Sequence, residues 1–466
     1  MSESLSRQLA GWAAELRFTD LPAEVVDRAK GVTLQGLGSA LLGSATPDGD
    51  TALRLMQAEE AGGAGLATVL VDGARLTRGG AAFVNAELIL AGGKWDTFRM
   101  LTHPGSAILP AALALAESVG ASGREYLVAV AAGYEIMERL AADFIPSVMA
   151  RGFHAGPVFG IFGAAVAASK LIGLSADQTH GAIAQCVNLA AGNLEGARSG
   201  GRSVREGAAV RNALLAVALA QHGAPGGETV LEGEAGFYHA YSGNNLGRLT
   251  YSFSGATSTA LEDIVAGLGE RWMFLETLYR IYSTPGYNIA HVAVTSALCA
   301  EHDIHAAEVD RVEAVVNWLE TQYPSPAFPS PDRTGVSVAS PHYFVAYGVV
   351  FRGYPLLHSG EHPPQVLDLM QRVTLIPSHA QPLFAPRVTV YLRDGRSFSR
   401  QAGGREFVWN FAEEARRIRE ITPGVPIPSS QFEELISACG RLDELAQADD
   451  VVRLTLRERR GASFSG

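Results

Sequence analysis

Apolar segments built mainly from Ala, Gly and Leu recur through about the first 265 of the 466 residues in this chain. Ala is the strongest helix former, and a helix that is apolar on most sides must be buried in a larger core. Small side chains also allow helices to pack closely. The pattern therefore predicts a bundle of many closely packed helices, with buried members at residues 81–90, 110–119, 160–172 and 207–222.

Helix-start and helix-stop signals lie between these segments. Pro22, after Asp20 and Leu21, is typical of a first helical turn. Ser122-Gly-Arg-Glu125 matches a capping box and predicts a long helix through Leu140. Gly173 is placed to end one helix, and Ser175-Ala-Asp-Gln178 to cap the next.

The residue pattern changes after about residue 265. Residues 272–282 and 310–320 carry aromatic and β-branched side chains. Asp394-Gly395 lies between two alternating runs in residues 387–399, which predicts a β-hairpin. From residue 408 the chain returns to an amphipathic helical pattern. We therefore expect a mainly α fold, with an all-helical domain of residues 1–267 plus 403–466 and an inserted α+β domain of residues 268–402.

The charge balance limits the class of binding partner. The chain is 47% hydrophobic and 18% charged, with a formal net charge of −11 at pH 7. Nucleic-acid binding needs a basic surface, so we expect no nucleic-acid partner. A small anionic substrate remains compatible, because a local Arg cluster can be positive inside an acidic protein.

Targeting and cysteine patterns favour a reduced cytoplasmic setting. No apolar run reaches the roughly 18 residues that span a bilayer, and the first residues do not resemble a secretory signal. Cys186, Cys299 and Cys439 lie far apart and show no metal-binding spacing. We expect no membrane segment, no metal and no disulfide framework. Phosphate-loop, dinucleotide-binding and serine-hydrolase motifs are absent from the sequence, so nucleotide cofactors are not expected.

A polar stretch, residues 93–106, interrupts two apolar helical segments and is the first candidate site. It places Asp96, Thr97 and His103 in a loop between predicted buried helices, as catalytic groups often are. The alternative is an ordinary helix connection in which Pro104 begins the next helix.

Three further segments carry candidate residues. His154 lies in a Gly-rich turn and could act as an acid or base near neutral pH, or could simply bond nearby backbone. Arg202 and Arg205 belong to a Gly-rich basic run that could bind carboxylates or be a solvated loop. Arg280 and His291 bracket the presumed domain junction, where ligand sites are common, although His291 could simply pack at a helix start.

Taken in order, these segments resemble the MmgE/PrpD family, which includes 2-methylcitrate dehydratase, cis-aconitate decarboxylase and iminodisuccinate epimerase. The resemblance covers nearly the whole chain. The matching segments are Asp20-Leu21-Pro22, the Asn85 segment, Thr102-His103-Pro104-Gly105, Ile108–Glu117, Gly133-Tyr134-Glu135, Gly152-Phe153-His154, Leu171–Leu174, Gly207-Ala208-Ala209 and Leu231–Phe237. The resemblance implies a helical domain split by an inserted α+β lid, a homodimer, an active site between the two domains and no required cofactor.

The resemblance also implies roles for single residues. His103 matches the histidine of the family's His-Pro motif, and Asp96 and Thr97 match the end of its acidic motif. His154 matches the histidine of Gly-Phe-His, and His291 matches the lid histidine.

The chain also departs from the family pattern. Gly93 and Trp95 stand where further aspartates are usual, and Leu90 where a histidine is common. Arg202 and Arg280 replace lysines. Because arginine stays protonated, it can hold a carboxylate but cannot act as a base at neutral pH.

We therefore expect a cofactor-independent lyase of the dehydratase type that acts on a small di- or tricarboxylic acid through α-proton abstraction. His103, His154 and His291 are expected to transfer protons, with Asp96 and Thr97 orienting the site. The residues expected to bind substrate carboxylates are Arg202, Arg205 and Arg280. An epimerase, isomerase or decarboxylase acting on a similar polycarboxylate is the alternative within enzymes. A carboxylate-binding protein without activity is the alternative from another class.

Overall fold

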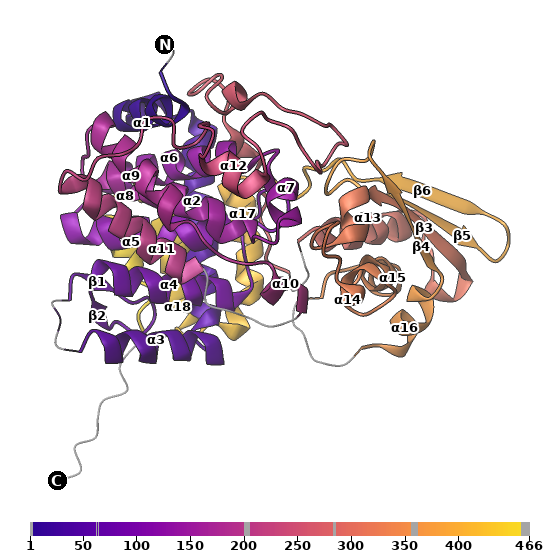
Figure 1. The fold of residues 1–466 in the computed structure, drawn as a ribbon. Helices are drawn as coiled ribbons and strands as arrows, with labels where there is room; N and C mark the ends of the chain where they lie inside the picture. The colour runs from indigo at the N-terminus through magenta and orange to yellow at the C-terminus, as the bar shows by residue number, and fades with distance from the viewer. Residues whose placement is uncertain are drawn as a thin grey trace, which may run out of the picture.

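The computed structural model describes residues 3–457, except 62, 64, 200–205, 283–285 and 356–361. Most of the described residues before 290, together with those after 402, share one hydrophobic core built from helices. Figure 1 shows these helices as the larger body of the molecule. Its members are α1 Leu5–Glu15, α2 Ala23–Gly43, α3 Pro47–Glu59, α4 Arg78–Gly92, α5 Pro104–Val119, α6 Gly123–Ala141, α7 Ile145–Ala150, α8 Ala155–Leu171, α9 Ala176–Leu189, α10 Glu195–Ser199, α11 Glu206–Gln221, α12 Phe237–Ser242, α17 Phe411–Ile418, α18 Ser429–Gly440 and α19 Asp450–Arg453.

Short elements complete this body. A two-stranded antiparallel ladder joins β1 Ala67–Thr68 to β2 Arg75–Leu76. The 3₁₀ helices of the chain are η1 Phe18–Asp20, η2 Leu261–Ile264, η3 Met273–Glu276, η4 Ala306–Glu308, η5 Trp318–Gln322, η6 Arg419–Gly424 and η7 Leu442–Glu444.

The capping signals in the sequence form as predicted. In the capping box of α6, the Ser122 hydroxyl accepts from the backbone N–H of Glu125, whose carboxylate accepts from the N–H of Ser122 at 2.7 Å. The same reciprocal pair, Ser175 with Gln178, begins α9. The C-cap of α5 is Gly120, in the left-handed conformation that glycine adopts most easily.

Two helix starts differ from the prediction. Helix α5 begins at Pro104 rather than at residue 110, so Pro110 lies inside it. Pro110 cannot donate a backbone hydrogen bond, but every residue of this helix from Pro104 to Ala116 is buried, and that packing outweighs the missing bond. Helix α8 begins at Ala155, directly after His154.

Glycines let the central helices approach as closely as predicted. At Gly163 of α8, an added Cβ would lie 2.7 Å from the carbonyl oxygen of Gly133 in α6. The same Cβ would lie 2.8 Å from the Ile108 side chain of α5. Such separations leave no room for a larger side chain, so the three helices depend on glycine where they meet.

A second hydrophobic core lies in the smaller body of Figure 1 and is built from α13, α15, α16 and one sheet. The sheet has the strand order β4-β3-β5-β6, with β3 parallel to β4 and antiparallel to β5. Strands β5 and β6 pair as the predicted hairpin. The elements are α13 Asn288–Glu301, β3 Val309–Asn317, α14 Pro331–Thr334, α15 Pro341–Phe351, α16 Pro364–Met370, β4 Val373–Ser378, β5 Arg387–Leu392 and β6 Ser397–Gln401.

The segment 272–282 packs into the larger core and helps to form the candidate site. Instead of joining the four-stranded sheet, it makes an isolated antiparallel bridge between Leu278 and Thr97. After the second core, the chain returns to the larger body, where α17 and α18 pack against α2. The described chain is thus mainly α, as predicted. None of its helices has the length and the apolar content needed to cross a membrane.

Candidate active site

The candidate loop between α4 and α5 is held by backbone contacts at both of its ends. Helix α4 ends at Gly93, which has a left-handed φ of 73°. The Trp95 indole then donates to the carbonyl oxygens of Ile89 and Leu90, at 3.2 and 3.0 Å. Thr97 and Leu278 exchange two backbone hydrogen bonds of 2.9 Å. These contacts place the side chains of residues 94–97 between the helical body and the segment after η3.

Asp96 is a buried carboxylate at the start of α5. Its oxygens accept from the Gly105 backbone N–H at 2.9 and 3.1 Å and from the Tyr134 hydroxyl at 2.5 Å. Burial raises the pKa of Asp96 to about 6, although these hydrogen bonds and the charge of Arg280 oppose the rise. At neutral pH Asp96 is therefore mainly an anion that accepts hydrogen bonds at a helix start.

His103 is the N-cap residue of α5 and is buried beside Trp95, with 4.4 Å between the two ring centroids. Its Nδ1 lies 3.0 Å from the backbone carbonyl oxygen of Asp96. A carbonyl oxygen can only accept, so Nδ1 must carry a proton. In the neutral imidazole, Nε2 then holds the lone pair and can act as a base.

His154 has the opposite arrangement. It is the N-cap residue of α8, and its Nδ1 accepts from the Gly156 backbone N–H at 3.1 Å. In the neutral imidazole the proton must therefore be on Nε2, which can donate it. His154 is 1% exposed, so this hydrogen bond is made within the protein interior.

The helix starts that carry the two histidines lie close together. A Cβ added at Gly160 of α8 would lie 2.9 Å from the Cβ of Ala107, in the first turn of α5, so the two helices are close there. Glu206, the first residue of α11, also lies beside the start of α8: a Cβ on Gly156 would be 3.1 Å from its carboxylate and 3.2 Å from the His154 ring. Three helices of the larger body thus begin around this point.

Arg280 brings a buried cation to the loop. The residue is 2% exposed, and its guanidinium carbon lies 4.5 Å from the centroid of Trp95. Within the part of the chain that the structure describes, its Nε has no hydrogen-bond partner. Burial lowers the pKa of Arg280 to about 10, with nearby Tyr323 and Asp96 acting in the opposite direction, so it is cationic at neutral pH. A buried guanidinium with a donor to spare is suited to holding a carboxylate.

His291 lies in α13 and is fully buried. Its Nε2 is 2.9 Å from the carboxylate of Glu320 in η5, and both side chains are buried. Ring contacts connect it to the site, because Tyr287 lies against both His291 and Tyr323, and Tyr323 lies near Arg280. The structure thus brings His291 toward the loop with a carboxylate that can orient its ring.

Among the described residues, Arg280, His291 and residues near them in the fold carry buried polar atoms without a hydrogen-bond partner. Such atoms are uncommon in protein interiors, because each costs free energy unless a ligand or water satisfies it. A cluster of them therefore marks a place for a polar ligand. The atoms are Arg280 Nε, Tyr287 Oη, Asn288 Oδ1 and Nδ2, His291 Nδ1 and Glu320 Oε1.

The sequence prediction missed three residues of this region. Tyr134 lies in a matching motif, but nothing in the sequence links it to Asp96. Glu320 is the last residue of the β-favouring segment 310–320 and carries no signal of its own. Lys94 is in the polar run but is 5% exposed in the structure, and burial together with the charge of Arg280 lowers its pKa to about 8. Arg202 and Arg205 lie outside the described residues.

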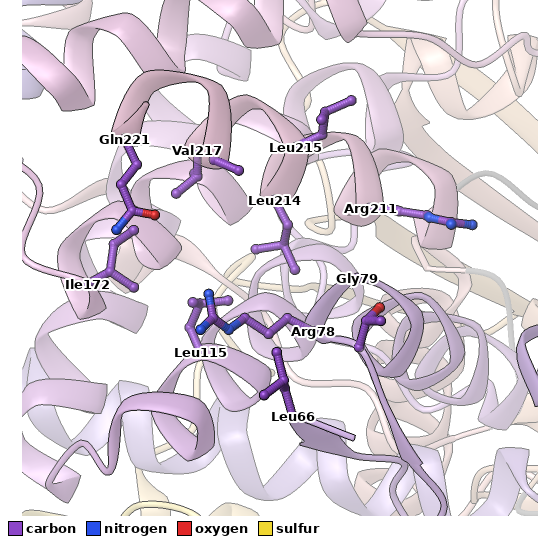
Figure 2. A pocket seen from close by; sticks show the side chains of 12 residues that line it. Leu66, Arg78, Gly79, Leu115, Ile172, Arg211, Leu214, Leu215, Val217 and Gln221 are labelled. Atoms are coloured by element: carbon purple, nitrogen blue, oxygen red, sulfur yellow. The ribbon is translucent and has the colours of Figure 1, made fainter. Parts of the chain in front are cut away.

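Other features of the described chain lie away from this region. A hollow of about 280 Å³ lies between α4, α5 and α11, lined by Leu66, Leu115, Arg78, Arg211 and Leu214 among others (Figure 2). Cys186, Cys299 and Cys439 are buried free thiols. Among the described residues, no group of three or more His, Cys, Asp or Glu side chains could hold a metal ion.

Comparison with known proteins gives consistent matches. A family model described as the MmgE/PrpD N-terminal domain matches residues 7–248. The cis-aconitate decarboxylase-like protein oryM of Aspergillus oryzae is 31% identical over 294 residues, which are 61% of this chain and 59% of that protein. Cis-aconitate decarboxylase of Aspergillus terreus is 27% identical over 422 residues, 84% of this chain and 83% of that protein. Cis-aconitate decarboxylase of Mus musculus is 25% identical over 480 residues, 97% and 94% of the two chains.

The family match agrees with the geometry described above. It covers more than half of the chain and includes the loop of Asp96 and His103 as well as the turn of His154. The resemblance seen in the sequence motifs is confirmed: the chain belongs to the MmgE/PrpD family.

Proposed function

We propose that this protein is a cofactor-independent lyase that acts on a small di- or tricarboxylic acid. One observation carries the proposal: two buried histidines at adjacent helix starts have opposite tautomers, as the partners of their Nδ1 atoms require. One imidazole can accept a proton while the other donates one, which is the pairing that an elimination needs. The buried cation Arg280 and the unpaired polar atoms around it support a carboxylate substrate.

The reaction that we propose first is a dehydration. His103 Nε2 takes a proton from the carbon next to a substrate carboxylate, and the C–H electron pair moves into an enolate-like intermediate. Arg280 stabilises the negative charge that develops there. His154 then gives its Nε2 proton to the departing hydroxyl group, which leaves as water while the electron pair forms a carbon–carbon double bond. His291, oriented by Glu320, can return or relay protons.

A decarboxylation is the second candidate, and the names of the relatives favour it. Here a carbon–carbon bond breaks, carbon dioxide leaves, and the electron pair remains as the same enolate-like intermediate. His154 would then protonate the carbon. An epimerase would use two bases and no leaving group, and Gly93 and Trp95 in place of the family's usual aspartates keep this alternative open. A carboxylate-binding protein without activity is the remaining alternative.

The wider organisation is part of the proposal. We propose that residues 268–402 act as a lid over the helical domain, that the substrate binds between the two, and that Arg202 and Arg205 provide further carboxylate contacts. Support comes from the two separate cores and from the contact of Arg280 with Trp95 of the loop. We also propose that the protein is a homodimer.

A panel of di- and tricarboxylic acids incubated with the protein in deuterated water tests the proposal. Proton and carbon NMR should reveal an alkene with loss of the hydroxyl group for dehydration, or released carbon dioxide for decarboxylation. Exchange of the α-proton with an intact carbon skeleton would instead indicate an epimerase. Binding without turnover of any panel member would contradict the lyase proposal. The matched control is a His103→Asn protein purified in the same way.

A further inference from the structure

The stretch 277–280 leads the chain into the candidate site and ends at Arg280. It lies outside the helices and the four-stranded sheet, yet all four of its residues are buried. A buried segment without regular structure must find hydrogen-bond partners for its backbone in other parts of the protein. The partners of this stretch therefore show how Arg280 is held.

Two helices hold the first residue of the stretch. The Arg28 guanidinium, in α2, donates to the backbone carbonyl oxygen of Thr277. The Thr277 hydroxyl in turn donates to the carboxyl group of Glu138, in α6. Arg28 and Glu138 are both buried, and burial of such groups costs free energy that only good hydrogen bonds offset. Both side chains thus serve to fix one point of the backbone.

The last residue of the stretch is held by Gln35 of α2. Its side-chain amide nitrogen donates to the backbone carbonyl oxygen of Arg280 at 2.8 Å, and Gln35 is 1% exposed. Because a carbonyl oxygen only accepts, Gln35 must present its NH₂ group to it. Gln35 lies seven positions after Arg28, which is two helical turns, so one face of α2 holds both ends of the stretch.

The side chain of Arg280 is bordered at its far end by the loop and by the residue before α13. Its guanidinium carbon lies 4.5 Å from the Trp95 ring centroid. A Cβ on Gly286 would lie 3.3 Å from its Nη1. An arginine side chain has many rotamers, and a ligand that must immobilise it binds less tightly. A fixed backbone and a bordered guanidinium reduce that freedom before any ligand arrives.

We propose that Gln35 is a positioning residue: by holding the backbone carbonyl of Arg280, it places the guanidinium where it can bind one carboxylate group of the substrate. Gln35 thereby tightens binding without touching the ligand. The inference rests on the proposed function for the ligand class and for the role of Arg280. Gln35 lies outside every segment that carries the family resemblance.

Calorimetric titration with propane-1,2,3-tricarboxylate at pH 7 tests the inference, because this acid has no hydroxyl group to eliminate. Gln35→Met keeps the approximate size of the side chain and removes the donor. We expect it to bind the acid about three- to tenfold more weakly, the range for one side chain that must be ordered on binding. Arg280→Met removes the charged contact itself and should weaken binding by about ten- to a hundredfold.

The double variant separates positioning from a general effect on the fold. If Gln35 acts through Arg280, then Gln35→Met should not weaken binding further once Arg280 is replaced by Met, because the effects of coupled residues do not add. A purely structural role would instead weaken binding by the same factor in both backgrounds. Circular dichroism during thermal unfolding shows whether each variant is folded.

Thr33→Val is the matched control in the same helix. Thr33 is also buried, and its hydroxyl donates to the Ala29 carbonyl oxygen at 2.7 Å. Loss of this hydrogen bond should lower the melting temperature, as Gln35→Met should, but it should leave the affinity for the acid unchanged.

Thr277→Val is a second variant, which keeps the inference testable if Gln35→Met does not fold. It removes the hydrogen bond to Glu138 at the other end of the stretch. Burial raises the pKa of Glu138 well above its usual range, so the change leaves a neutral carboxyl group. We expect weaker binding of the acid here too, again with no further loss in the Arg280→Met background.

The outcomes distinguish this inference from the proposed function. Unchanged affinity in a folded Gln35→Met protein, the same loss in both backgrounds, or an equal loss in Thr33→Val would overturn the positioning role and leave the carboxylate substrate class standing. Wild-type affinity in Arg280→Met would overturn the role of Arg280 as well. If no tricarboxylate or dicarboxylate of the panel binds to the wild type, both proposals are wrong.

Discussion

Individual hydrogen bonds decide what each histidine of the site can do. His103 and His154 are both buried N-cap residues, and the sequence offers no means of telling their roles apart. The carbonyl oxygen of Asp96 requires a proton on His103 Nδ1, whereas the backbone N–H of Gly156 requires a lone pair on His154 Nδ1. Trp95 adds a further constraint, because its indole contacts both the His103 ring and the Arg280 guanidinium.

Replacement of His103 by Asn tests the base role at this scale. The Asn amide can still donate to the Asp96 carbonyl but cannot accept a proton from carbon, so we expect kcat to fall by about 10²–10⁴ with little change in KM. Steady-state kinetics on a substrate from the panel provide the measurement. His222→Ala, at an exposed position after α11, is the control and should leave both constants unchanged. Near-normal kcat in His103→Asn would contradict the assignment of the base.

At the scale of helices, glycine contacts set how α5, α6 and α8 pack. The site depends on this packing, because His103 and His154 are at the starts of α5 and α8, and Tyr134 reaches Asp96 from α6. A residue larger than glycine at Gly163 would push α8 away from the Gly133 carbonyl. Such a shift would move the helix starts apart and with them the two histidines.

Two glycine-to-alanine substitutions in helices should have opposite effects on stability. Gly163→Ala places a Cβ 2.7 Å from a backbone oxygen, so we expect the free energy of unfolding to fall by about 1–3 kcal/mol or more. In Gly11→Ala the new Cβ, in α1, has no described atom within 4 Å. We expect this substitution to raise the free energy of unfolding by about 0.5–1 kcal/mol, because alanine is the better helix former. Thermal unfolding followed by circular dichroism compares both proteins with the wild type. A Gly163→Ala protein with an unchanged melting temperature would show that the helices are not in tight contact.

On the scale of the whole molecule, the larger helical body leaves an apolar face in the isolated chain. Leu215 and Leu219, one turn apart on α11, are 49% and 38% exposed. Beside them is the leucine-lined hollow of Figure 2, to which Leu66 and Leu115 contribute. Large apolar groups clustered on one face favour burial against another surface. Because the family resemblance implies a homodimer, we propose a second copy of the chain as that surface.

Light scattering after size-exclusion chromatography should therefore give twice the 49.2 kDa mass of one chain. Leu215→Glu combined with Leu219→Glu should shift the protein toward the monomer, because two charges would have to be buried at the interface. Leu246→Glu is the control, since this leucine is 64% exposed in a loop. A wild-type protein that remains monomeric at micromolar concentration would contradict the homodimer, and an unchanged dimer in the double variant would place the interface elsewhere.

Local patterns in the sequence were sufficient for several of the longer elements. The capping boxes at Ser122 and Ser175 and the Asp394-Gly395 hairpin depend on residues a few positions apart, so their signals survive without tertiary context. Small-residue runs likewise predicted the close helix packing seen at Gly163. Where a helix begins was less predictable: Pro110 is typical of a helix start, but the burial of α5 on every side extends the helix to Pro104.

By itself, the sequence determined the family, the mainly α class and the residue types available for chemistry, because these depend on motifs and on periodicity along the chain. Only the tertiary structure decided which of these residues meet. Arg280 approaches Lys94 and Trp95, and His291 pairs with Glu320, although these groups are far apart in the sequence. The tautomers of His103 and His154 depend on backbone atoms, which every residue has, so no residue type signals them. The lowered pKa of Lys94 has the same origin, since burial and a second cation exist only once the chain has folded.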